Sequence, residues 1–415
     1  NKTTPKGVSA EWLIPKALWV KTHRPDVWKR TQSVMEMHDY LCFRLTLRRI
    51  SSINTATQRA LYDSSSESYP IDLLEKIGLS DLTDKLPPVI RVGERVGHVS
   101  GDVIIELGLG KGVEVICGGG DAFVGLLGMG VANAGDYGLM TGSSNVIAGF
   151  EKNPGVELVR SIHNKGVFGP FRDAVIPGLE LIEAGQPSSG SMLVWMRKMF
   201  AQGLTFQQLD REAAEVPIGS GGVLVFDCFQ GSRTPYVDSK VRGAIIGLSL
   251  ATTRQQLYRA GLESVAFATR LSVESVSPSS HPKLESKDTK AKNVGWSEGS
   301  VSPLVVVGGA TRSSFFMQIY ADVLGRELLT LSTSNAALLS AAIVAASGAS
   351  ISGGSLAETS RRFTKQGRKY VPDANRHEQY SIFYQLYKNL YPALRPTMHQ
   401  LCASNNSHSH TKQSR

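Results

Sequence analysis

The sequence contains few residues that could form cross-links or bind a metal ion. It has four cysteines in 415 residues, none of them in a Cys-x-x-Cys pair, and no histidine stands at the spacing of a metal ligand. A structural zinc site is therefore not expected. Sparse, unpaired cysteines are typical of proteins from a reducing compartment. The four are Cys42, Cys117, Cys228 and Cys402.

Other common signatures are also missing. No run of about 18 apolar residues is present, so no segment is predicted to span a membrane. The pattern GxxxxGK[ST] does not occur, and no GxGxxG follows a predicted strand, which excludes a P-loop and a dinucleotide site of the usual type. The first residue is Asn, so the sequence carries no information on a targeting segment ahead of it. We expect a cytoplasmic protein and leave organelle targeting open.

The charge is positive but not concentrated. The net charge is +9, yet the basic residues are scattered and lack the aromatic interleaving of a nucleic-acid surface. We interpret them as ordinary solvated charge, with help in attracting anionic ligands as the alternative. Hydrophobic residues make up 41% of the chain, which is typical of a globular protein with room for two or three domains.

Alternating strand and helix patterns predict an α/β protein with two domains. We expect a first domain over residues 1–133 and a second over 134–402. Helices are predicted between 10 and 50, short strands at 88–90 and 113–117, and a β-hairpin over 137–150. Residues 275–300 show no periodicity and are predicted to be a disordered insertion, as is the polar tail 403–415.

One candidate catalytic residue stands where a predicted strand ends. The strand at 113–117 stops at three glycines, which are followed by Asp121 and an apolar run. Such a junction places the acid at the carboxyl edge of a sheet, where α/β folds bind ligands. Asp121 could act as a general base toward a sugar hydroxyl. The alternative is a helix N-cap, because Asp is a common cap before an apolar run.

Two further segments could bind phosphate. The turn Thr-Gly-Ser-Ser at 141–144 offers backbone N–H groups and hydroxyls, although a plain hairpin turn would look the same. Gly308, Gly309 and Ala310 lie between a strand and a helix, which would let a nucleotide approach the backbone and a helix N-terminus. Such glycines also occur merely for packing. The three segments together are more specific than any one of them.

Together with other motifs, these segments resemble the FGGY family of carbohydrate kinases, and more closely its ribulokinase-like branch. The resemblance runs from about residue 8 to 402, apart from 275–300. It implies the two-domain actin/Hsp70/hexokinase fold, which is ribonuclease H-like. The stretches that carry it are Glu-Trp-x-x-Pro-Lys at 11–16, the helix at 38–46, 118–123, 141–144, Glu-Ala-Gly-Gln-Pro-Ser-Ser-Gly at 183–190, Gly-Ser-Arg-Thr-Pro at 231–235 and 308–313.

The resemblance also implies roles for individual residues. Asp121 would deprotonate the acceptor hydroxyl, with Ala122 beside the substrate. Glu183 would bind sugar hydroxyls, unless it is a structural ion-pair partner, and Arg59 aligns with a sugar-contacting lysine. The residues implied to bind phosphate or nucleotide are Thr141, Gly142, Ser143, Ser144, Gly308, Gly309, Ala310 and Thr311, with Asn335 near the ribose or base.

The implied reaction is transfer of the γ-phosphate of ATP, with Mg²⁺, to a terminal hydroxyl of a small sugar, either a ketopentose such as ribulose or a polyol. We expect a sugar and ATP as ligands, no protein ligand set for the metal, no nucleic acid and no membrane; a homodimer is left open. No Asp-x-Gly-Thr occurs, although the family's first phosphate hairpin carries it. We therefore expect the first domain to be incomplete. The chain is then either a fragment of a kinase or a catalytically inactive relative that still binds nucleotide.

Overall fold

The computed structural model describes residues 9–276, 302–333 and 335–410. The insertion predicted at 275–300 lies outside the described residues, except that its first two residues end a helix. Residues 411–415 of the predicted tail lie outside them as well.

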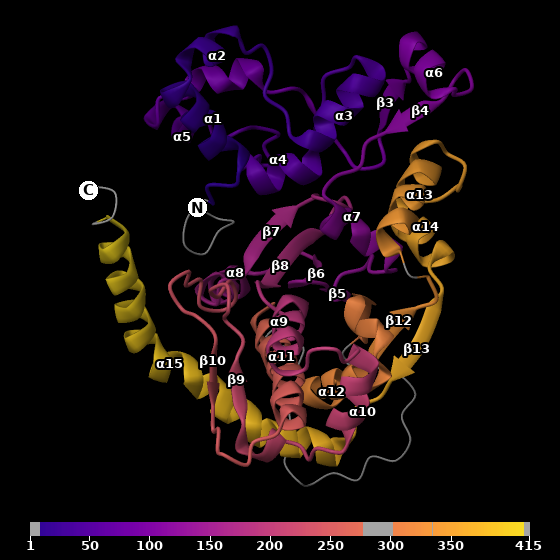
Figure 1. The fold of residues 1–415 in the computed structure, drawn as a ribbon. Helices are drawn as coiled ribbons and strands as arrows, with labels where there is room; N and C mark the ends of the chain where they lie inside the picture. The colour runs from indigo at the N-terminus through magenta and orange to yellow at the C-terminus, as the bar shows by residue number, and fades with distance from the viewer. Residues whose placement is uncertain (1–8, 277–301, 334, 411–415) are drawn as a thin grey trace.

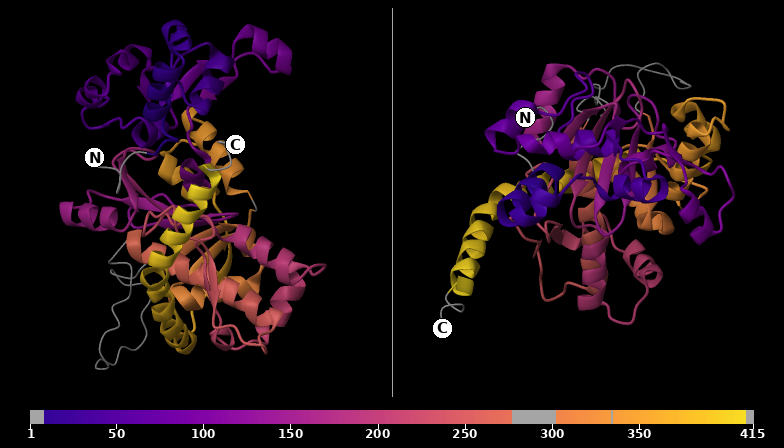
Figure 2. Two further views of the ribbon diagram at one scale, coloured as in Figure 1. Left: turned by 60° about the vertical axis from the view of Figure 1, so that its left-hand side comes forward. Right: turned by 90° about the horizontal axis from the view of Figure 1, so that it is seen from above.

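The chain forms two lobes (Figures 1 and 2), and the smaller one, residues 9–120, is drawn in indigo to purple. Its strands form only two short pairs, and its apolar helix residues gather in two small clusters rather than one large core. The strands predicted at 88–90 and 113–117 are confirmed as β2 and β4. The helices are α1 (Leu13–His23), α2 (Pro25–Arg30), α3 (Met37–Thr46), α4 (Ile53–Arg59), α5 (Ile71–Lys76) and α6 (Gly101–Leu107). The strand pairs are parallel β1 (Ser51–Ser52) with β2 (Val89–Ile90), and antiparallel β3 (Arg95–His98) with β4 (Glu114–Ile116).

The larger lobe is built on a seven-stranded mixed sheet in the order β13-β12-β11-β5-β6-β8-β7. The predicted hairpin is confirmed as the antiparallel pair β5 and β6. Strand β11 lies parallel to β5 and β12, so the ends of β5 and β11 meet at one edge of the sheet. The strands are β5 (Tyr137–Thr141), β6 (Asn145–Glu151), β7 (Phe168–Arg172), β8 (Glu180–Gln186), β11 (Leu304–Gly308), β12 (Leu328–Leu331) and β13 (Gln366–Tyr370).

Helices cover both faces of this sheet, which explains why its central strands are apolar along their whole length. The face toward the smaller lobe carries α7 (Asp121–Gly128), α13 (Ala336–Gly348) and α14 (Leu356–Phe363). The opposite face packs against the large core cluster of the molecule. Its helices are α9 (Gly190–Phe200), α10 (Phe206–Ala214), α11 (Arg254–Val276), α12 (Ser314–Leu324) and α15 (Ala374–His410). Outside these layers lie α8 (Val156–Asn164) and the antiparallel pair β9 (Leu224–Phe226) and β10 (Ala244–Ile246).

Helix α7 crosses α13 so closely that the contact requires a glycine. A Cβ atom added to Gly128 would lie 1.9 Å from the carbonyl oxygen of Ala336. Small residues on both helices therefore let the two backbones approach. This contact ties the helix that begins at Asp121 to the sheet of the larger lobe.

The C-terminal tail differs from the prediction. Helix α15 continues through His410, so residues 403–410, predicted to be disordered, are helical. The physical reason is that extending an existing helix costs far less than starting one, so polar residues can follow the long packed segment before them. The end of α15 projects away from the larger lobe (Figure 2, right).

Candidate active site

The turn between β5 and β6 is closed by its own backbone. The N–H of Gly142 donates to the carbonyl of Ser144 at 3.0 Å. The carbonyl oxygens of Gly142 and Ser143 accept from the N–H groups of Gly190 and Ser189, at 3.1 and 3.0 Å, where α9 begins. Among the described residues no hydrogen bond uses the N–H of Ser143 or Ser144. Two donors of the turn therefore stay available for an anion.

The buried side-chain amide of Asn145, directly after the turn, fixes its position by hydrogen bonds. The Nδ2 group of Asn145 lies 3.2 Å from Oε1 of Gln186 and 3.0 Å from the hydroxyl of Tyr320. Its Oδ1 accepts a hydrogen bond of 2.9 Å from Ser189. Because Asn145 is almost fully buried, these bonds fix the start of β6 and with it the turn.

The turn and the glycine loop after β11 are hydrogen-bonded to each other. Gly308 pairs with Thr141 across the parallel ladder. The Thr141 hydroxyl donates to the carbonyl of Val307 at 2.8 Å and accepts from the N–H of Ala310 at 3.1 Å. The two predicted phosphate segments thus form one wall, and the hydroxyl of Thr141 serves to join them.

This wall borders a cavity of about 680 Å³, enclosed on the other sides by α9 to α12. Binding sites for nucleotide-sized ligands are typically about 300–1,000 Å³ and mostly apolar, with a few fixed polar groups. The predicted residues that line it are Thr141, Gly142, Ser143, Gly309 and Ala310. The lining residues that the sequence analysis missed include Arg197, Phe206, Asp210, Tyr258 and Phe316. They stand on amphipathic helices, so the pattern alone indicated only core packing.

Other predicted nucleotide residues do not reach the cavity lining. Ser144 is the last residue of the turn and is not part of the cavity lining. The Thr311 hydroxyl donates to the carbonyl of Gly308 at 2.7 Å. Asn335 caps helix α13, because its Oδ1 accepts from the N–H of Leu338 at 3.1 Å. Its side chain therefore has a local structural role.

Asp121 is the first residue of α7, and the N-cap position is occupied by Gly120. The alternative that Asp121 is the N-cap is therefore not what the structure shows. The Asp121 side chain is exposed and accepts one hydrogen bond, 2.8 Å from the N–H of Ala122. At least one carboxylate oxygen is thus without a hydrogen-bond partner among the described residues and could accept a proton.

Glu183 lies on β8 on the face that looks toward the smaller lobe. Burial raises the pKa of Glu183, and the charges of Arg233 and Arg59 act against that rise. Arg59 ends α4 of the smaller lobe, whereas Arg233 belongs to the loop after β9, so three elements bring charge to one place. The sequence analysis expected Glu183 and Arg59 there, but not Arg233.

The Arg233 side chain packs against Gly185. A Cβ atom on Gly185 would lie 3.2 Å from Cδ of Arg233, which leaves no easy room for a side chain. The loop is held there by the N–H of Thr234, which donates to the carbonyl of Gly185 at 3.1 Å. Residues 183 and 185 share one face of the strand, so the Arg233 side chain that lies against Gly185 is on the same face as Glu183.

Within residues 9–276, 302–333 and 335–410, no cluster of three or more His, Cys, Asp or Glu side chains could hold a metal ion. In the same ranges no helix is both long enough and apolar enough to cross a membrane.

Comparison with known proteins decides the family. The model for the N-terminal domain of the FGGY family of carbohydrate kinases matches residues 4–128, and the model for its C-terminal domain matches residues 141–349. The chain belongs to the FGGY family of carbohydrate kinases. The resemblance noted in the sequence is confirmed, and so is the assignment to phosphotransferases that act on carbohydrates.

FGGY relatives with curated names include pentulose kinases. Xylulose kinase of Bacillus subtilis (strain 168) is 28% identical over 92% of this chain and 70% of its own length. Ribulokinase 1 of Staphylococcus saprophyticus is 30% identical over 93% of this chain and 70% of its own length. The crystal structure of xylulose kinase from Rhodospirillum rubrum has a TM-score of 0.77 at 27% identity, covering 96% of this chain and 75% of that chain. The predicted two-domain α/β fold is thereby confirmed.

Proposed function

We propose that this FGGY kinase transfers the γ-phosphate of ATP to a terminal hydroxyl of a small sugar, a ketopentose such as xylulose or ribulose, or a polyol. The observation that carries the proposal is the single wall formed by the 141–144 turn and the 308–310 loop beside a nucleotide-sized cavity. The proposed substrate class follows the names of the relatives. We further propose that the two lobes act as the closing domains expected at 1–133 and 134–402, with α7 (Asp121–Gly128) packed on the sheet of the larger lobe.

In this proposal the larger lobe holds the nucleotide. The free N–H group of Ser143 would donate to phosphate oxygens, and Gly142, Gly309 and Ala310 would line the phosphate and nucleoside path. Magnesium commonly binds through substrate phosphates and one or two carboxylates, so the ion would arrive with ATP. The ion would neutralise charge on the β- and γ-phosphates.

The sugar would lie between the lobes. Asp121 would accept the proton of the attacking hydroxyl, with Ala122 beside it, and Glu183 would accept hydrogen bonds from other hydroxyls. The charges of Arg233 and Arg59 act against the burial that raises the pKa of Glu183, and Arg59 could also donate to the sugar. Closure of the lobes would exclude water from these groups.

Replacing Glu183 by glutamine is expected to raise the KM for the sugar by roughly 10–100-fold, because a hydrogen bond to a charged group is worth about 1.5–3 kcal/mol. The KM for ATP should stay nearly constant. Steady-state kinetics with each substrate varied in turn would measure both. Glu180→Gln, on the same strand but the opposite face, is the matched control. Equal sugar KM values for the two variants would contradict a sugar-binding role for Glu183.

A second candidate is a non-catalytic relative that binds nucleotide without turnover, which the lack of Asp-x-Gly-Thr in the 415 residues favours. The two candidates are separated by a coupled assay for ADP release, with a panel of pentuloses and polyols. Sugar-dependent ADP release would exclude the second candidate. Binding of ATP by calorimetry with no release for any sugar would exclude the first for this chain.

A further inference from the structure

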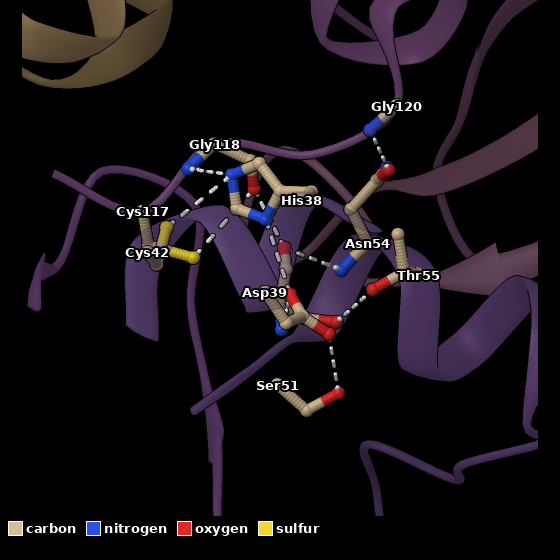
Figure 3. A network of polar contacts seen from close by, with 10 residues as sticks. His38, Asp39, Cys42, Ser51, Asn54, Thr55, Cys117, Gly118 and Gly120 are labelled. Atoms are coloured by element: carbon tan, nitrogen blue, oxygen red, sulfur yellow. Dashed lines mark hydrogen bonds and ion pairs between the residues drawn. The ribbon is translucent and has the colours of Figure 1, made fainter. Parts of the chain in front are cut away.

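A network of buried polar groups lies beneath the glycine segment that precedes Asp121 (Figure 3). Its centre is Asp39 on α3, a carboxylate with no exposed surface. The hydroxyl of Ser51 and the N–H of Ser52 donate to it at 3.2 and 3.0 Å. Nδ1 of His38 lies 3.1 Å from its Oδ1. A buried carboxylate with several donors is a rigid anchor for the imidazole.

Side chains from this network hold both ends of the glycine segment. Nε2 of His38 accepts from the N–H of Gly118 at 3.2 Å, and the Ser52 hydroxyl donates to the carbonyl of Gly118 at 2.6 Å. Oδ1 of Asn54 accepts from the N–H of Gly120 at 2.8 Å. Three backbone atoms of residues 118–120 are therefore fixed by side chains of the smaller lobe.

The amide of Asn54 also connects the two lobes. Its Nδ2 donates to the carbonyl of Ala174 in the larger lobe at 3.0 Å. A Cβ atom on Gly119 would lie 2.6 Å from Oδ1 of Asn54, so only glycine permits this approach. The glycines before Asp121 thus have a role that the sequence pattern did not reveal. They leave room for the Asn54 side chain, which hydrogen-bonds to the backbone.

The protonation state of His38 determines whether its hydrogen bond with the N–H of Gly118 can form. Nε2 can accept from an N–H only when it carries no proton, so the proton of the neutral ring stands on Nδ1, facing Asp39. Burial disfavours a charged ring, but the hydrogen bond with Asp39 and then the contact with Cys42 outweigh it and raise the pKa of His38 to about 9. The N–H of Gly118 opposes this, because it favours the neutral ring.

Protonation of His38 and the Gly118 bond therefore exclude each other: the bond forms above the pKa of His38 and is lost as the pH falls through that pKa. The neighbouring thiol of Cys117 stays neutral, since burial raises its pKa to about 12. The titratable groups in and around the network, from the helix of His38 and from the other elements, are Asp39, Cys42, Tyr69, Glu94 and Cys117.

We propose that His38 and Asn54 are positioning residues of the kinase: they hold residues 118–120 so that Asp121 is kept in place, and protonation of His38 releases the Gly118 end. The effect on catalysis rests on the proposed role of Asp121, whereas the hydrogen bonds that hold the backbone of residues 118–120 do not. The two can therefore be tested separately.

Amide hydrogen exchange tests these hydrogen bonds to the backbone directly. Above the pKa of His38, where the wild-type ring is neutral, the protection factor of the Gly118 amide should fall by about 3–10-fold in His38→Ala, the worth of one hydrogen bond. Asn54→Ala should do the same at Gly120. His38→Gln should restore protection at Gly118, because Oε1 of glutamine can occupy the place of Nε2 without titrating. Exposed His98→Gln in the same lobe is the control. Unchanged protection at Gly118 in His38→Ala, with native folding verified by its melting curve, would overturn the proposal.

The pH dependence tests the switch. In the wild type, protection at Gly118 and kcat should be highest above the His38 pKa of about 9 and should fall together as the pH falls through it. The ring-nitrogen NMR shifts would report the protonation of His38 over the same range. In His38→Gln neither should fall over that range. A misplaced base commonly costs up to about 100-fold, so kcat of His38→Ala should drop by roughly 10–100-fold with little change in the KM for ATP.

If the alanine variant does not fold, the pH titration of the wild type and the His38→Gln variant still test the proposal. A ring that carries its neutral-state proton on Nε2 would overturn the proposal. A His38→Gln variant in which kcat and the protection of Gly118 still fall as the pH is lowered would also overturn it. Failure of Asp121 as the base would remove the effect on kcat, but would leave the exchange results as they are.

Discussion

Asp121→Asn is expected to lower kcat by about 10²–10⁴-fold, the usual worth of general-base catalysis, with the Kd for ATP nearly unchanged. The amide keeps the size of the side chain and can still accept the hydrogen bond from the N–H of Ala122. It cannot take a proton from a hydroxyl. Single-turnover and steady-state rates, with calorimetric titration of ATP, would separate the loss of chemistry from a loss of binding.

The chain offers a close control for this substitution. Asp102 is also exposed in the first turn of a helix of the smaller lobe, α6. Asp102→Asn removes the same favourable interaction with the helix dipole, typically about 0.3–1 kcal/mol, without touching the region between the lobes. If kcat of Asp121→Asn stays within a few-fold of that of Asp102→Asn, Asp121 is not the base.

The parts of the site that the sequence predicted are those in which backbone geometry is encoded locally. Apolar runs that end in glycine predicted the ends of β4, β5 and β11, because such strands must turn there. The meeting of the 141–144 turn with the 308–310 loop could be expected only through the resemblance to the family. The structure explains that meeting by the parallel pairing of Thr141 with Gly308.

The parts that the sequence did not predict depend on contacts between distant segments. Arg233 packs against Gly185 and its charge opposes the burial that raises the pKa of Glu183, and no local pattern indicates that approach. The motif around His38 was noted as a helix, but its bond to Gly118 joins residues 80 positions apart. For Asn335 the resemblance to the family implied a place near the ribose or base, and the structure adds that its side chain caps helix α13.

Gly308→Ala is expected to lower the free energy of unfolding by roughly 2–5 kcal/mol, the sum of a left-handed backbone penalty and overpacking. Gly308 has a φ angle of 100°, and a Cβ atom there would lie 1.9 Å from the carbonyl oxygen of Thr141. The clash pushes β11 away from β5 at the point where Thr141 bonds to Val307 and Ala310. Loss of these two bonds should also weaken ATP binding by about tenfold or more.

Gly309→Ala is the control that separates the clash at position 308 from the general effect of replacing a glycine in this loop. A Cβ atom on Gly309 meets nothing within 4 Å, so its unfolding free energy should change by no more than about 0.5 kcal/mol. Thermal melts with and without ATP would show both effects of Gly308→Ala: a lower melting temperature, and a smaller rise when ATP is added, because a weaker ligand stabilises less. Equal melting temperatures for the two variants would mean that the backbone at β11 relaxes freely. The wall that joins the two phosphate segments would then not depend on Gly308.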